Sequence, residues 1–250
     1  MFALLRSKYI FMKRKDRLLA HHLYLLLAGL FITSLVVSNL IFQKFFYWYP
    51  LNIKFFDIPL FELSVGILPY PITFLITDLI SEIYGQKNAN KVVVVGIFSS
   101  IFAMGIILLA DAVPAIAGSP IDDDTFSAVF SLSPIAVLAS MLAYLLAQFF
   151  DIRLYHFWKR LTQGKHLWLR NNFSTFLSQI VDTTAVLVLL CSFGVLRWEL
   201  FFGLLVSGVV FKILIALVDT PFLYFFVFLF KRRFELKVGE EIDFIEPECK

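Results

Sequence analysis

Ionisable side chains interrupt four long apolar segments of the chain, where charge is normally avoided. These side chains are Asp78 and Glu82 in one segment, Asp151 in the next, Asp182 in a third, and Lys212 and Asp219 in the last. A charge in the hydrocarbon core of a bilayer costs about 2.5–3.5 kcal/mol on the insertion scale, so it usually serves a solute or ion pathway. These six residues are therefore the first candidates for a binding site.

Asp182 and Asp219 fall near the middle of their segments, and Lys212 lies further outward on the same segment as Asp219. Lys212 and Asp219 are seven residues apart, which is two helical turns and about 10 Å along a helix. One interpretation is a buried ion pair that holds helices together, since a lysine can neutralise nearby carboxylates without any ligand. The other is a solute site at the centre of a helix bundle, with Lys212 as the resting counter-ion. The residues alone leave both interpretations open.

Asp78 and Glu82 are four residues apart and would share one face of a helix. If both are shielded from water, repulsion between like charges would make one of them keep a proton, which suits proton-coupled transport. Glu82 lies close to the predicted inner end of its segment, so a solvated helix end is the alternative interpretation for this residue.

The pattern Gln-x-x-Asp occurs twice, at Gln148 with Asp151 and at Gln179 with Asp182. Each copy places an amide and a carboxylate on one helix face. A planar heterocycle with adjacent ring N–H and amino groups would match such a carboxylate, and aromatic side chains could stack on its faces. This chemistry favours a nucleobase-like solute over a sugar or a metal ion. The chain has no phosphate loop, no histidine pair at ligand spacing and no nucleophile elbow, so we expect no metal site, no cofactor and no enzyme activity.

The elements that carry these residues are predicted to be membrane-spanning helices. Hydrophobic residues make up 60% of the 250-residue chain and charged residues only 16%, against about 25% charged residues in soluble domains. A helix needs about 20 apolar residues to cross the hydrocarbon. Six segments meet this length: 23–42, 63–84, 92–112, 134–158, 173–195 and 203–230. We expect an all-α integral membrane bundle of six transmembrane helices.

Lysine and arginine residues alternate between the connections, which predicts the orientation. They concentrate before the first segment, between the second and third, between the fourth and fifth, and after the sixth, whereas residues 122–124 are all aspartate. Because short basic loops stay cytoplasmic, we expect a basic cytoplasmic N-terminal segment (1–22), a six-helix transporter domain (23–233) and a cytoplasmic C-terminal tail (234–250). The tail shows no recognisable chemistry, and the net charge of +3 gives no indication of nucleic-acid binding.

Two further features are typical of transporters. Pro69 and Pro71 lie inside the second segment and should break or kink its helix, and broken helices expose backbone groups to a cavity. Thr-Phe-Leu occurs at 73–75 and again at 175–177. Because three helices per half would orient the halves in opposite directions, two inverted three-helix repeats would account for this echo.

Three segments together resemble the bacterial queuosine-precursor transporters, a family of inner-membrane proteins of the vitamin uptake type. The first is Pro-Ile-Thr-Phe-Leu-Ile-Thr-Asp-Leu-Ile-Ser-Glu-Ile-Tyr-Gly at 71–85, and the second is Gln-Phe-Phe-Asp at 148–151 followed by His156. The third is Trp-Leu-Arg-Asn-Asn-Phe-Ser-Thr at 168–175, which runs on to Gln179 and Asp182. The resemblance covers about residues 20–235. Phe173 departs from it, since a small residue such as glycine is expected there.

The resemblance implies an importer of 7-deazaguanine bases, chiefly 7-cyano-7-deazaguanine, which bacteria use to make the modified tRNA base queuosine. It implies a multi-pass protein of the bacterial cell inner membrane, with a deazapurine substrate and no enzyme activity. The substrate-binding residues that it implies are Asp78, Glu82, Gln148, Asp151, Arg170, Asn171, Ser174, Gln179 and Asp182. Lys212 and Asp219, which the resemblance does not include, are expected to form an ion pair or a coupling site.

Roles for these residues follow from the same resemblance. Asp151 and Asp182 are expected to accept from the ring N–H and amino groups of the base, and Gln148 and Gln179 to contact its carbonyl or ring nitrogens. Asp78 and Glu82 are expected to gate or to carry a proton. Arg170 and Asn171 are expected to organise an inner gate, although a topology anchor at the membrane surface is an equal alternative for Arg170.

A second function class fits the same features. Six compact helices around a small ligand would also suit the substrate-binding membrane subunit of an energised vitamin-type importer, which needs partner proteins. A membrane enzyme or a structural interaction protein would be expected to show a nucleophile, a metal cluster or a soluble domain. The expected partners are the small solute and membrane lipid, and homodimer formation is left open.

Overall fold

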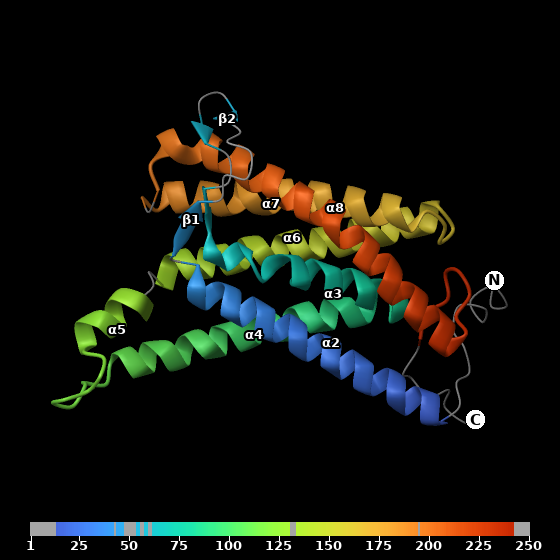
Figure 1. The fold of residues 1–250 in the computed structure, drawn as a ribbon, viewed down its shortest axis with the longest axis horizontal. Coiled ribbons are helices and arrows are strands. Elements are labelled where there is room, and N and C mark those ends of the chain that lie inside the picture. The colour runs from blue at the N-terminus through green and yellow to red at the C-terminus, as the bar shows by residue number, and fades with distance from the viewer. Residues whose placement is uncertain are drawn as a thin grey trace.

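The computed structural model describes residues 14–42, 44–47, 54–55, 58–59, 62–130, 134–194 and 196–242. Within these residues the chain is almost entirely helical, as Figure 1 shows. The α-helices are α2 (Arg14–Ile41), α3 (Tyr70–Ile83), α4 (Gln86–Asp111), α5 (Asp123–Phe130), α6 (Pro134–Leu161), α7 (Leu167–Ser192) and α8 (Phe201–Phe234). The predicted all-α class is confirmed.

Five helical segments in the described part of the chain are long and apolar enough to cross a membrane. They are Lys15–Ile41, Val65–Ile83, Gln86–Asp111, Leu167–Ser192 and Trp198–Phe234. Helix α6 is not among the five, but its 28 residues correspond to about 42 Å, which exceeds the ~30 Å of hydrocarbon. The multi-pass membrane class is therefore confirmed, and a count of six crossings remains a prediction.

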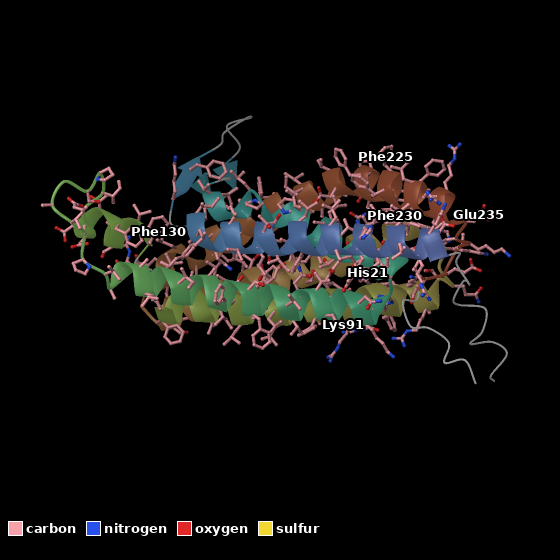
Figure 2. All side chains as sticks on the ribbon, turned by 90° about the horizontal axis from the view of Figure 1, so that it is seen from below. His21, Lys91, Phe130, Phe225, Phe230 and Glu235 are labelled. Atoms are coloured by element: carbon pink, nitrogen blue, oxygen red, sulfur yellow. The ribbon has the colours of Figure 1, made fainter. Side chains whose placement is uncertain are left out.

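Large apolar side chains cover the outside of the bundle. Phe98 and Phe102 on α4 are 69% and 71% exposed, and Phe225 on α8 points outward in Figure 2. Many Leu, Ile and Val side chains of α2, α4 and α8 are exposed in the same way. An apolar surface this extensive would not be stable in water, so it is the surface that faces lipid.

Helix α3 is the central element of the bundle. Ten of its 14 residues are buried, and it packs against α2, α4, α6 and α8. At 1.5 Å per residue it is about 21 Å long, which is shorter than the hydrocarbon core. Helix α3 is therefore largely enclosed by its neighbours, although Ile72 is exposed, and its buried face carries polar side chains inside the protein.

The two prolines determine where α3 begins. A 3₁₀ turn (Val65–Ile67) precedes the helix, Pro69 occupies the N-cap and Pro71 lies in the first turn, where a missing N–H costs nothing. The break that the prolines predict in the second segment therefore lies between the 3₁₀ turn and α3. Gly66 lets the turn approach α2, because a Cβ on it would lie 2.7 Å from the Ser38 carbonyl oxygen.

Four short strands precede this turn. They are β1 (Phe45–Tyr47), β2 (Lys54–Phe55), β3 (Ile58–Pro59) and β4 (Glu62–Ser64). β1 pairs with β4 and β2 with β3, and both pairs are antiparallel. The β1–β4 pair leads directly into the 3₁₀ turn and positions the start of α3.

The two ends of the bundle differ in charge. The start of α2, the α3–α4 turn, the α6–α7 connection and the end of α8 lie together, as Figure 1 shows, and an ion pair of 2.9 Å joins Arg233 to Asp16 there. We call this the basic end. Helix α5 lies at the opposite end, so that Phe130 and Glu235 are far apart in Figure 2.

Helix α2 begins at Arg14, which lies within the predicted basic N-terminal segment (1–22). Residues 1–13 and 243–250 lie outside the described part of the chain.

Candidate functional site

A stripe of four side chains on α3 connects the middle of the bundle to its basic end. Tyr70, Phe74, Asp78 and Glu82 recur at every fourth residue, so they share one helix face. The stripe is 12 residues and about 18 Å long. Polar residues from α6, α7 and α8 meet it at three depths, which we call the outer, middle and inner layers.

The outer layer contains a pocket between α3, α7 and α8 with about 270 Å³ of empty space. This volume includes space that is open to solvent. The lining residues are Ile67, Tyr70, Pro71, Phe74, Thr175, Gln179, Phe211, Lys212, Ile215, Ala216 and Asp219. The walls are thus mainly aromatic and aliphatic, with a few polar groups among them.

Lys212 is neutralised by Asp182 at one side of this pocket. Its Nζ lies 2.5 Å from Asp182 Oδ2, and the Tyr70 hydroxyl donates to the same oxygen. The ammonium also lies 4.3 Å from the centroid of the Tyr70 ring, within cation–π range. The sequence left open whether Lys212 forms a buried ion pair, and the structure shows that it does so with Asp182. No ion pair to Asp219 is seen in the described residues.

Several polar atoms at or beside the pocket are buried without a hydrogen-bond partner in the described part of the chain. They are Thr175 Oγ1, Gln179 Oε1 and Asp182 Oδ1, of which the first two belong to pocket-lining residues. Buried polar groups are almost always bonded, so an unpartnered one in a pocket marks a place where a ligand or water can bond.

The middle layer consists of side chains bonded to one another. Asp151 accepts a 2.8 Å hydrogen bond from the Ser178 hydroxyl, whereas Asp151 Oδ2 and Asp78 Oδ1 are buried without a hydrogen-bond partner in the described part of the chain. Gln148 donates to the Tyr144 hydroxyl at 2.6 Å. None of these residues lines the pocket.

The inner layer is centred on Glu82. Its Oε1 lies 2.7 Å from Arg170 Nη2 and 2.8 Å from Lys231 Nζ, and its Oε2 lies 3.3 Å from Lys159 Nζ. Tyr155 donates to the same carboxylate at 3.2 Å. Glu82 is only 1% exposed, so the solvated helix end is wrong: its neighbours on three helices enclose it and supply its counter-charges.

Arg170 is a second fixed point of this layer. It is 0% exposed, and besides Glu82 its guanidinium donates to the carbonyl oxygens of Gly164 and Lys165 at 2.8 and 3.0 Å. A topology anchor would point into the headgroups. The surface-anchor interpretation is therefore wrong, because the Arg170 guanidinium bonds to Glu82 of α3 and to backbone carbonyls of the α6–α7 connection.

The chain after α8 folds back over the inner layer. Glu241 is buried and lies 3.0 Å from Lys159 Nζ, and the Ile242 N–H donates to the Ile83 carbonyl oxygen at 2.7 Å. Gly85 at the α3–α4 turn has φ +80°, and a Cβ on it would collide with Glu241. The tail thus covers the basic end of the polar stripe.

The predicted site residues are distributed over all three layers. Gln179 lines the pocket and Asp182 lies behind it; Asp78, Gln148 and Asp151 form the middle layer; Glu82 and Arg170 form the inner one. Asn171 donates to Thr220 Oγ1 at 3.3 Å and so ties α7 to α8. Ser174 is buried and donates to the Asn171 carbonyl oxygen. Direct solute contact by these residues remains a prediction.

Sequence reasoning missed several residues of the site. Tyr70, Phe74 and Thr175 line the pocket, and Lys159, Lys231 and Glu241 complete the inner layer. The four-residue spacing of Tyr70 and Phe74 from Asp78 was an available signal for two of them. Lysines at helix ends had been counted only for orientation, so nothing distinguished Lys159 and Lys231.

No group of histidine, cysteine and acidic residues suited to a metal ion occurs in the described part.

The model of the family described as "Putative vitamin uptake transporter" matches residues 64–226. The chain belongs to this family. The matched region begins at the end of the last strand before α3 and includes all of the pocket-lining residues.

A curated relative, "Probable queuosine precursor transporter" of Bacillus subtilis (strain 168), is 29% identical over 165 residues, which cover 64% of this chain and 70% of the relative. No solved structure shows a significant match. The recognition of the family from three short segments is therefore confirmed.

Proposed function

We propose that this protein imports queuosine precursors, namely 7-cyano-7-deazaguanine and related 7-deazaguanine bases, across the bacterial inner membrane. The family membership and the name of the Bacillus relative support this substrate class. In this proposal all six long helices cross the membrane. The basic end and both termini face the cytoplasm, because the lysines and arginines of the short connections gather there.

The observation that carries the proposal is the pocket. Tyr70, Phe74 and Phe211 offer aromatic faces for a planar base, and ring stacking adds to the apolar contact. Gln179 Oε1 and Thr175 Oγ1 are the unpartnered atoms that could bond its polar edge. Asp182 contributes by holding Lys212 and Tyr70 in place at the pocket wall.

Release toward the cytoplasm requires the inner layer to open. In the described structure Glu82 and Arg170 form a buried ion pair at the basic end, and Glu241 of the tail pairs with Lys159 beside them. Alternating access moves one part of a bundle against another around a central site. In the proposed cycle the ion pairs of Glu82 are the inner gate, and they break when the solute leaves.

The alternative is a substrate-binding subunit that needs the energised partners of a vitamin-type importer. Purified protein reconstituted alone into liposomes separates the two. We expect uptake of labelled 7-cyano-7-deazaguanine by liposomes that contain only this chain, with the base recovered chemically unchanged. Binding without uptake would favour the subunit, a changed base would point to an enzyme, and neither binding nor uptake would contradict the proposed substrate.

The Asp182→Asn substitution tests the site within the same experiment. Removing the carboxylate frees Lys212 from its 2.5 Å contact and leaves a cation in the pocket wall, so we expect uptake to fall by at least about tenfold. Glu199→Gln is the matched control, since the side chain of Glu199 is exposed. Equal uptake by both variants would remove Asp182 from the site.

A further inference from the structure

We propose that Asp219 is a specificity residue that makes the pocket prefer bases carrying an ammonium group over neutral bases of the same shape. This inference rests on the proposed function and names the part of the solute class that the site recognises best. It begins from the charges that line the pocket between α3, α7 and α8.

Two charged residues occur among the described pocket-lining residues, and only one of them has a partner. Lys212 is paired with Asp182 at 2.5 Å, whereas no ion pair or hydrogen bond to the Asp219 carboxylate is seen in the described structure. The positive charge of Lys212 is therefore already offset, and the pocket retains one negative charge. A solute with one positive charge would complete it.

The position of Asp219 suits a substituent at the far edge of a bound base. Phe211, Lys212, Ile215, Ala216 and Asp219 lie on one face of α8, and Lys212 and Asp219 are about 10 Å apart along the axis. The two charges thus lie at different positions along the pocket wall that α8 provides.

Helix α7 faces this space with the unpartnered oxygens of Thr175 and Gln179. Both residues are more than nine-tenths buried and line the same pocket. Their oxygens could bond the polar edge of the base while its side arm extends to Asp219. The pocket therefore holds neutral bonding groups for the base and a separate carboxylate for an amine.

An unpaired carboxylate at this depth is unfavourable until a cation reaches it. Asp219 is half-buried on a membrane-spanning helix, where an uncompensated charge is costly. An ammonium in hydrogen-bond contact would remove that cost and form a charge-assisted bond, which is stronger than a neutral one. A nitrile in the same place would instead meet a carboxylate that it cannot bond.

The test uses competition between two probes that differ in this one group. The full chain in liposomes is given 7-aminomethyl-7-deazaguanine, whose amine is cationic at neutral pH, and neutral 7-cyano-7-deazaguanine. We expect the wild type to prefer the aminomethyl base, and Asp219→Asn to lower the aminomethyl-to-cyano uptake ratio by about 10- to 100-fold. Asp219→Glu should restore part of the ratio, and Glu199→Gln, which is exposed, should not change it.

The ratio distinguishes the possible failures. If both bases enter and Asp219→Asn leaves the ratio unchanged, the specificity role is overturned while the proposed function stands. If Asp219→Asn abolishes uptake of both bases together, or alters the pH dependence of uptake of both, Asp219 is a structural or proton-carrying residue. Either result would also overturn the specificity role. If the wild type imports neither base, the proposed function fails first and this inference fails with it.

Discussion

Replacing Glu82 by glutamine should strongly destabilise the protein although it changes the side-chain shape very little. The carboxylate contacts Arg170, Lys231 and Lys159 at 2.7, 2.8 and 3.3 Å. Glutamine keeps the hydrogen-bonding oxygen but removes the charge that these cations share. The result is a fully buried guanidinium with no carboxylate beside it.

The size of the effect follows from which cation loses its only carboxylate. Lys159 retains Glu241 at 3.0 Å, and Lys231 is partly exposed, so both keep some compensation. Arg170 loses its only ion pair in the described structure. Breaking one buried pair by removing a partner costs about 3–5 kcal/mol. At about 2–4 °C per kcal/mol for a chain of this size, the melting temperature should fall by about 6–20 °C.

Thermal unfolding of the purified protein, followed by circular dichroism in one detergent, measures this shift. Glu199→Gln is the matched control, because its pair with Arg197 is 3.5 Å long and both side chains are 77–80% exposed. An exposed pair contributes about 0–1 kcal/mol, so this variant should melt within about 4 °C of the wild type. If Glu82→Gln melts no lower than the control, the inner layer is hydrated and cannot be a closed gate.

Two further substitutions test how the site is framed. Gly66→Ala places a Cβ 2.7 Å from the Ser38 carbonyl oxygen and from the Cβ of Phe42, so it should destabilise the protein by about 1–3 kcal/mol. The control is Gly105→Ala, whose Cβ would lie in open space. This variant should be neutral or stabilising in the same thermal melt. Glu241→Gln removes the 3.0 Å ion pair with Lys159 and should release the tail. Limited trypsin digestion should then cut faster after Lys237, and an unchanged cleavage rate would show that other contacts hold the tail.

Much of this architecture is predictable from hydropathy and charge. Runs of about 20 apolar residues predict spanning helices because an unbonded backbone is not tolerated in lipid. The alternation of basic and non-basic connections predicted that the basic ones lie at one end of the bundle, and the structure places them together there. The prolines at 69 and 71 predicted a break or kink within the second segment, and the structure places the start of α3 there, because a proline fits a first helical turn but not a helix interior.

The partners of the buried charges were not predictable in the same way. Spacing along one helix shows which residues share a face, but it says nothing about which neighbouring helix supplies the counter-charge. Asp78 and Glu82 share a face of α3, yet Glu82 is paired with Arg170 whereas Asp78 Oδ1 has no hydrogen-bond partner in the described residues. Glu241 was beyond reach for a similar reason, because only the fold brings the tail back to the α3–α4 turn.

The account depends most on the claim that the pocket between α3, α7 and α8 holds the solute, and filling the pocket tests this directly. Ala216 is buried and lines it, while the next residue, Leu217, is exposed on the lipid-facing side. Equilibrium binding of labelled 7-deazaguanine base to purified Ala216→Trp and Leu217→Trp should show binding lost in the first and retained in the second. Wild-type affinity in a folded Ala216→Trp protein would contradict the claim.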